Sequence, residues 1–122
     1  MTDPGAARLR GRGAARWQLP DVDERALALA RQLRRAMRQL TEVGQARWMS
    51  VLDPQLAPLE DGDVAAVRAA ANRIRSAFGV GESVAEELPE DAGRALRDAT
   101  DALIRALDRH DARSARSAST GR

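Results

Sequence analysis

The chain has 122 residues and a formal net charge of +2, with 20 arginines but no lysine, cysteine or tyrosine. These absences exclude a thiol nucleophile, a cysteine-based metal site, a Schiff-base lysine and a phenol from its chemistry. Its length predicts one domain, and its 25 alanines, with few aromatic or β-branched residues, predict an all-α fold.

The first predicted segment is a flexible basic arm over residues 1–19. Glycines interrupt any helix in this stretch, and its Arg-Gly sequence after Arg8 resembles segments that bind RNA nonspecifically. We expect Trp17 to anchor the arm or cap the bundle, with stacking on a nucleic-acid base as the alternative.

A long first helix is predicted to begin near Asp21, which has a glutamate three residues later, and to end before Pro54. Apolar residues recur at steps of three and four along it, which places them on one helical face. Such a helix would be about 45 Å long. The residues of this stripe are Ala26, Leu29, Leu33, Met37, Leu40, Gly44, Trp48 and Val51.

Residues 53–62 are predicted to form a loop whose Leu56 and Leu59 fold back on the core. A second helix follows, capped by Asp61 or Asp63, and Gly79 suits a left-handed C-terminal cap. Its apolar stripe is Val64, Val67, Ala71, Ile74 and Phe78.

A third helix is predicted to begin at Pro89, with Glu90 and Asp91 in its first turn, and to end near Asp108. The chain then divides into the arm, a helical bundle domain over residues 20–110, and a flexible basic tail over residues 111–122. We expect a three-helix bundle with one long N-terminal helix and flexible basic tails. Its shared core is predicted to contain Leu33, Met37, Leu40, Val67, Ile74 and Leu103.

Charge is unevenly distributed along the sequence. Residues 1–16 hold four arginines and one aspartate, residues 109–122 hold the same, and residues 17–108 hold 12 arginines and 16 acids. An acidic middle therefore separates two basic ends. The use of arginine in place of lysine is typical of a GC-rich bacterial genome, and selection for bidentate contacts to phosphate or carboxylate is the alternative.

Two groups of residues are candidates for binding. Arg31, Arg34, Arg35 and Arg38 concentrate charge on the first helix, either as a solvated face or as a docking surface for phosphate or an acidic partner. The candidate interaction surface consists of Arg31, Arg35, Arg38, Gly44 and Trp48. The candidate phosphate-contacting residues of the tails are Arg8, Arg10, Arg12, Arg16, Arg113 and Arg116.

Few residues suit catalysis or metal binding. His110 is the only histidine, and we expect it to interact with carbonyls at the end of the third helix. Neighbouring aspartates form too loose a cluster to predict a metal site, and no cofactor is expected. No apolar run reaches membrane-spanning length and no secretion signal is evident, so we expect a cytoplasmic protein.

A short segment, Glu42-Val-Gly-Gln-Ala-Arg47 with Arg35 upstream, is similar to the first helix of the all-helical chorismate mutases. The resemblance implies that Arg35 and Arg47 bind carboxylates, with Arg47 replacing the family's lysine. The spacing between these arginines is one residue longer than in the family, and the family's Arg-Glu pair has no counterpart around residues 61–67.

We therefore expect a small, non-enzymatic helical interaction protein that acts through self-association or a protein partner. The apolar stripe of the first helix is longer than the second helix. Part of that stripe would therefore stay uncovered and could be buried by a second copy of the chain or by a partner. The alternative is a nucleic-acid-associated accessory protein that contacts phosphate through its arginine-rich tails.

Overall fold

A computed structural model describes residues 15–78 and 84–120, and every regular element in these ranges is helical. The all-α prediction is thereby confirmed. The 3-10 helices are η1 (Arg16–Gln18), η2 (Ala46–Trp48) and η3 (Asp53–Gln55), and the α-helices are α2 (Pro20–Glu42), α3 (Met49–Leu52), α4 (Leu56–Asp61), α5 (Val64–Ser76), α6 (Val84–Glu87) and α7 (Glu90–Thr120).

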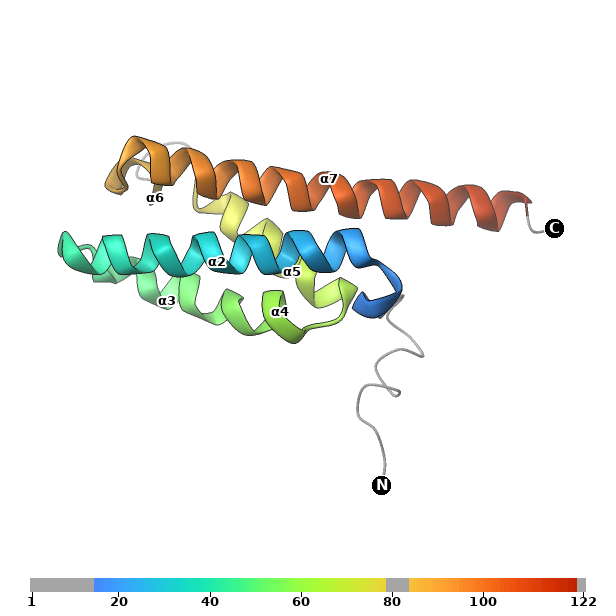
Figure 1. Cartoon of the computed structure of the whole chain (residues 1–122), viewed down its shortest axis with the longest axis horizontal. Helices are drawn as coiled ribbons and strands as arrows, with labels where there is room; N and C mark the ends of the chain where they lie inside the picture. The colour runs from blue at the N-terminus through green and yellow to red at the C-terminus, as the bar shows by residue number, and fades with distance from the viewer. Residues whose placement is uncertain (1–14, 79–83, 121–122) are drawn as a thin grey trace, which may run out of the picture.

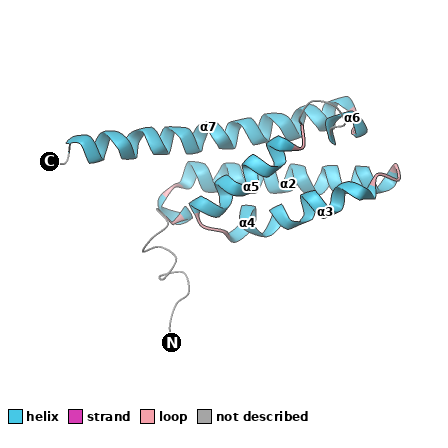
Figure 2. Ribbon diagram, turned by 180° about the vertical axis from the view of Figure 1, so that it is seen from behind, coloured by secondary structure: helices cyan, strands magenta, loops and turns pink. Residues whose placement is uncertain are grey.

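The two longest helices, α2 and α7, lie side by side and antiparallel (Figure 1). The segment from η2 to α4 returns along α2, and α5 packs between α4 and α7 (Figure 2). The predicted three-helix arrangement is too simple. The segment from η2 to α4, part of which was expected to be a loop, is helical and forms a fourth side of the bundle.

The predicted long first helix is wrong at its C-terminal end. Helix α2 stops at Glu42, and Gly44 has a φ of 77°. The amide of Gly44 donates to the Thr41 carbonyl oxygen (3.1 Å), and that of Gln45 donates to the Leu40 carbonyl oxygen (2.7 Å). These bonds form a Schellman motif, which glycine favours because a left-handed backbone strains other residues.

The predicted loop over residues 53–62 is also wrong, since η3 and α4 occupy it. Pro54 and Pro58 fit because each lies in the first turn of its short helix, where a missing amide hydrogen costs no helical bond. Leu56 and Leu59 are buried, which confirms that this segment folds onto the core.

A tight corner between α4 and α5 begins at Gly62. A Cβ atom there would lie 2.7 Å from the carbonyl oxygen of Pro58 and 2.9 Å from its Cα atom. Asp63 then caps α5, because its carboxylate accepts a hydrogen bond from the Ala66 amide at 2.8 Å. The second of the two predicted cap positions is therefore the one used.

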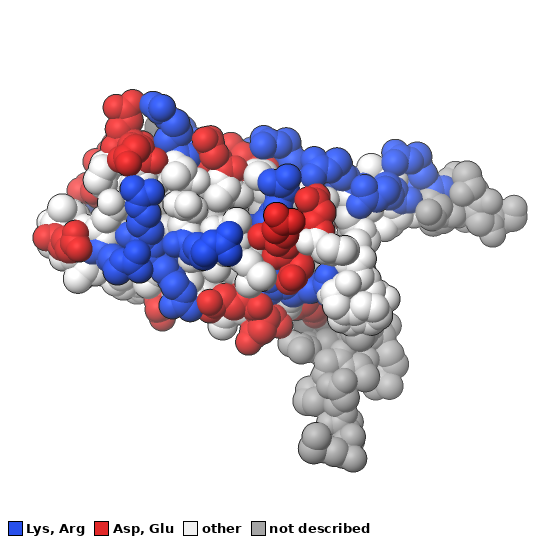
Figure 3. Space-filling view, in the orientation of Figure 1, with Lys and Arg blue, Asp and Glu red and all other residues white. Residues whose placement is uncertain are grey.

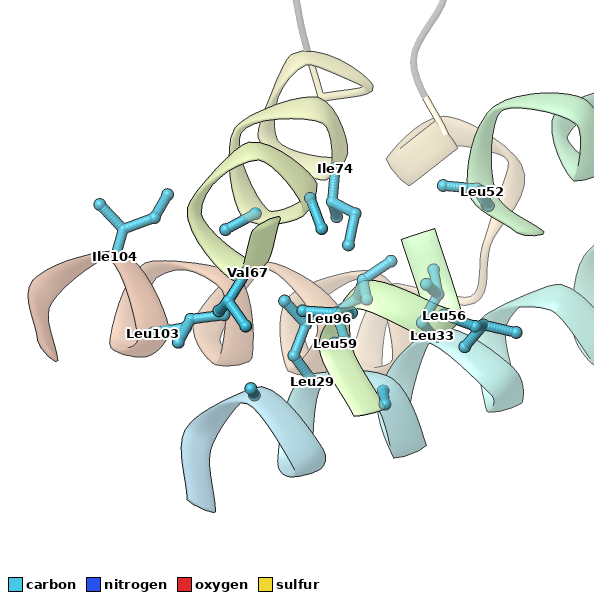
Figure 4. Close-up of a cluster of buried hydrophobic side chains, with 14 of the residues drawn as sticks. Leu29, Leu33, Leu52, Leu56, Leu59, Val67, Ile74, Leu96, Leu103 and Ile104 are labelled. Atoms are coloured by element: carbon cyan, nitrogen blue, oxygen red, sulfur yellow. The ribbon is translucent and has the colours of Figure 1, made fainter. Parts of the chain in front are cut away.

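All four sides of the bundle contribute to one hydrophobic core (Figure 4). Its fully buried side chains include Leu33, Leu40, Val67, Ile74 and Leu103, and Met37 packs partly buried against them. The predicted shared core is confirmed, because the three-and-four spacing turns these residues to the interior.

Helix α7 begins at Glu90, one residue after the predicted start at Pro89, and it continues to Thr120, past the predicted end near Asp108. Residues 111–116 are all exposed, and this part of α7 projects beyond α2 (Figure 1). Helix α2 begins at Pro20, one residue before the predicted start, and no side chain caps it. The Gly79 cap lies outside the described residues.

Candidate binding surfaces

Four arginines gather on the exposed side of α2, and we call them the α2 arginine face. Three of them, Arg31, Arg34 and Arg38, are exposed, and Arg35 is half-exposed. The spacing of three and four residues brings their guanidinium groups to neighbouring turns of the helix. Figure 3 shows the resulting group of basic side chains over α2.

Two members of the α2 arginine face are engaged within the chain. One Nη of Arg34 contacts both carboxylate oxygens of Glu60 at 2.7 Å, and this hydrogen bond raises the pKa of Arg34 above its usual value. Arg35 contacts Asp91 at 3.3 Å. These pairs tie α2 to α4 and to the start of α7.

The other two members have no such partner. Among the described residues, Arg31 and Arg38 form no ion pair or hydrogen bond through their side chains. Because both side chains reach solvent, their charges are hydrated in the free protein and available to an anionic partner. The sequence alternatives, a solvated face or a docking surface, thus stay open for these two residues.

A hollow of about 510 Å³ adjoins the α2 arginine face between α2 and the α3–α4 segment. Met37, Met49 and Leu56 provide its apolar lining, and Arg34 and Arg38 are among its charged residues. Methionine side chains adapt to varied apolar groups, so this methionine hollow can accept an apolar side chain beside the arginines.

Sequence reasoning missed the contribution of Met49 to this hollow. The glycine at position 44 could have indicated this contribution. Because the chain turns at Gly44, the following segment packs back along α2 and brings Met49 alongside Met37. The remaining members of the lining are Thr41, Glu42 and Asp53.

The predicted interaction surface is divided by the structure. Arg31, Arg35 and Arg38 lie on the α2 arginine face, whereas Gly44 forms the turn after α2. Trp48 is partly buried and packs against the core of its own chain, with Arg47 Cζ 5.5 Å from the ring centroid. The apolar stripe expected to run unbroken along one long helix is therefore interrupted.

The same break bears on the resemblance to chorismate mutases. Arg35 is on α2 but Arg47 is in η2, so the single helix that the resemblance implies does not connect them. Arg35 pairs with Asp91 and Arg47 with Glu87 at 3.7 Å, which directs both arginines to the corner between α6 and α7.

A second hollow, of about 730 Å³, lies between η3–α4 and α5. Its lining is dominated by small and apolar side chains, and Arg73 is its only charged member among the described residues. This hollow is large enough for a side chain of a partner, but its lining has too few charged groups to favour one kind of partner over another. The α2 arginine face is therefore the better defined candidate.

The predicted phosphate-contacting residues have different surroundings. Arg16 is 8% exposed; its Nε donates to Asp23 at 2.7 Å and one Nη donates to the Pro58 carbonyl oxygen at 3.2 Å. Arg16 therefore fastens η1 to α2 and α4, and its prediction as a tail contact is wrong. Arg113 and Arg116 are exposed on the projecting part of α7, while Arg8, Arg10 and Arg12 lie outside the described residues.

Trp17 is 76% exposed, so the interpretation that it anchors the arm or caps the bundle is wrong. It lies in η1, at the end of the molecule where α7 projects (Figure 1). His110 is half-buried on α7. Within residues 15–78 and 84–120, no group of three metal-ligating side chains is assembled and no helix is long and apolar enough to cross a membrane.

Comparisons with protein-family models, with curated proteins and with solved structures find no match to this chain.

Proposed function

We propose that the protein is a small, non-enzymatic binding module that docks an acidic protein segment on the α2 arginine face. The observation that carries this proposal is that Arg31 and Arg38 face solvent with no ion-pair partner among the described residues, and that Arg38 also lines the methionine hollow. Carboxylates of the partner pair with these arginines, and an apolar side chain of the partner enters the hollow.

The neighbouring ion pairs support this assignment. Because Arg34 and Arg35 already hold Glu60 and Asp91, they fix the geometry of the face without consuming Arg31 and Arg38. Two solvent-facing charges, one of them in the lining of a hollow with apolar side chains, favour an amphipathic acidic segment, whereas a purely charged polymer would leave the hollow unused.

Selection from a displayed library of random peptides tests the proposal directly. We expect the full chain to enrich peptides that combine aspartate or glutamate with leucine, methionine or phenylalanine. Their binding is abolished by Arg31→Glu combined with Arg38→Glu and by Met49→Glu. Arg73→Glu, a charge reversal on α5, is the matched control and leaves binding unchanged.

Two results would overturn this function. Enrichment of peptides without carboxylates, or of peptides that still bind the Arg31→Glu, Arg38→Glu variant, would move docking away from the α2 arginine face. A dimer in light scattering that dissociates with Arg38→Glu would make a second copy of the chain the occupant in place of an acidic partner segment.

A second candidate function, nucleic-acid binding through the arginine-rich ends, is favoured by one specific observation. The basic N-terminal residues join the structure at Ala15, and the projecting part of α7 lies at that same end of the molecule (Figure 1). In the sequence, residues 1–14 and residues 111–122 each hold three arginines and one aspartate, so two segments with a net charge of +2 are attached to one end of the bundle. Salt-dependent binding to random duplex DNA tests this function.

A further inference from the structure

The end of the molecule that carries η1 combines an exposed aromatic ring with arginine. Among the described residues, Trp17 is the most exposed large hydrophobic side chain, at 76% against 59% for Val43. Burying a tryptophan on folding would stabilise a small helical protein, because the indole has a large apolar area. Its exposure leaves an apolar, π-faced platform in solvent.

The turn that carries Trp17 is firmly built. On one side of it, Ala15 is buried and its amide donates to the Gln18 side chain at 3.1 Å. Next to it, the buried Arg16 is fastened to Asp23 and to Pro58, and the amide of Leu19 closes the turn onto the Arg16 carbonyl oxygen at 2.8 Å. The exposed ring is therefore held on an ordered frame, which reduces the entropy cost when a flat ligand stacks on it.

Positive charge reaches the same end through α7. Arg109 donates to Asp21 at 3.0 Å, in the first turn of α2 and four residues after Trp17. One turn further along α7, Arg113 is exposed and has no ion pair with any described residue. Arg116, another exposed arginine, follows, and Figure 3 shows basic side chains along the projecting part of α7.

The acidic residues nearby are engaged elsewhere. Asp108 and Asp111 both accept from Arg68 of α5, and Asp21 is paired with Arg25 and Arg109. Each of these three carboxylates is thus paired with an arginine other than Arg113, which faces solvent. Arginines at positions 8, 10 and 12 add positive charge in the sequence before Ala15.

An exposed aromatic ring at the same end of a molecule as exposed arginines is suited to binding single-stranded nucleic acid. A base can stack on an indole only when it is not already stacked in a duplex, and each such contact contributes about 1–3 kcal/mol. Arginine supplies the accompanying contacts to phosphate. We propose that Trp17, together with Arg113 and Arg116, forms a binding site for single-stranded nucleic acid; this inference rests on the second candidate function and gives it a ligand.

The test uses the full chain and a fluorescein-labelled oligothymidylate of about 12 nucleotides, which is within the usual site size for a single-strand binder. We expect Trp17→Ala to weaken binding about 5- to 150-fold, the factor that corresponds to the removal of one stacked base. Trp17→Phe, which keeps an aromatic face, should recover part of this affinity. Because Trp17 is exposed, neither substitution should change the helical content.

The charge contacts are separated from stacking by salt. Arg113→Glu combined with Arg116→Glu should reduce the slope of log affinity against log salt by about 0.7 for each phosphate that the protein no longer neutralises. Arg94→Glu, at the opposite end of α7, is the matched control and should leave both the affinity and the slope unchanged. A duplex of the same length should bind more weakly than the single strand and should be insensitive to Trp17→Ala.

The outcomes of this experiment distinguish the inference from the function on which it rests. Binding of single strand and duplex with equal affinity, both unchanged by Trp17→Ala, would retain the arginine-rich ends as phosphate contacts and overturn the role of Trp17. No binding to either oligonucleotide would overturn both. A tryptophan fluorescence shift with phosphatidylserine vesicles but not with oligothymidylate would replace nucleic acid by a membrane surface.

Discussion

Helix α7 is one continuous helix, but its N-terminal part packs against the bundle and its C-terminal part is exposed to solvent. The half that lies along α2 and α5 buries Leu96, Leu103 and Leu107 completely, whereas every residue from 111 to 116 is exposed. Alanine and arginine are both strong helix formers, so local propensity is sufficient to continue the helix past the bundle. Docking requires large apolar side chains, and the projecting half has none among its described side chains.

This difference separates stability from binding along one helix. The docked half holds α2 and α5 in place through apolar burial, which is the main favourable contribution to folding. The projecting half contributes little to that core, and for this reason its arginines can be changed without unfolding the protein. The nucleic-acid site proposed above depends on that independence.

The largest expected effect is on the docked half. Leu103→Ala removes a fully buried side chain and should lower the free energy of unfolding by about 2–5 kcal/mol. Deletion of residues 112–122 should change it by less than about 0.5 kcal/mol. Urea denaturation followed by circular dichroism measures both, and a comparable decrease from the two changes would contradict the division of α7.

A smaller effect is expected at the corner that positions α5 against the docked half. Gly62→Ala places a Cβ atom against the backbone of Pro58, so the corner must open at a cost of about 1–3 kcal/mol. Asp61→Ala, at the exposed neighbouring position, is the control and should be nearly neutral. If Gly62→Ala is as stable as the unmodified protein in the same urea titration, the close approach is not required.

Apolar periodicity was sufficient to predict the docked parts of the fold. Steps of three and four identified Leu33, Val67, Ile74 and Leu103 as interior residues, because only one helical face can be buried. The same rule failed at Gly44, where the spacing continued through Trp48 although the backbone turned. Periodicity cannot distinguish one long helix from two segments that both pack on the same core.

The binding surfaces were only partly predictable for a related reason. Arg31 and Arg38 were recognised because charge on the polar side of a helix is visible in the sequence. The methionine hollow depends on the return of Met49 towards Met37, which follows the unpredicted turn. The exposure of Trp17 could not be predicted from the sequence. The turn that holds it is fixed by the buried Arg16, and the sequence around Arg16 is typical of a flexible basic arm.

At the boundary between the docked and the projecting part of α7, Arg68 of α5 pairs with Asp108 and Asp111. Exposed ion pairs contribute about 0–1 kcal/mol each, so Arg68→Ala should reduce global stability only slightly. Hydrogen exchange should nevertheless become faster in residues 108–116 and stay unchanged in residues 96–107. Arg94→Ala, which removes a pair with Glu90 at the other end of α7, is the control and should leave exchange in residues 108–116 unaltered.

The smallest expected effect concerns pH at the junction of α2 and α7. The hydrogen bond from Arg109 lowers the pKa of Asp21 below its usual 3.8, against an opposing effect of burial and with a further contribution from the charge of Arg25. Since the pKa is lower in the folded state, the carboxylate stabilises the fold above its unfolded pKa, and this contribution disappears as the pH falls through the folded pKa.

The Asp21→Asn variant lacks this contribution to stability at every pH. The stability difference between the two proteins should therefore shrink between about pH 5 and pH 2 in urea titrations. A stability difference for Asp21→Asn that grows on acidification would show that the Arg109 contact does not hold α7 to α2.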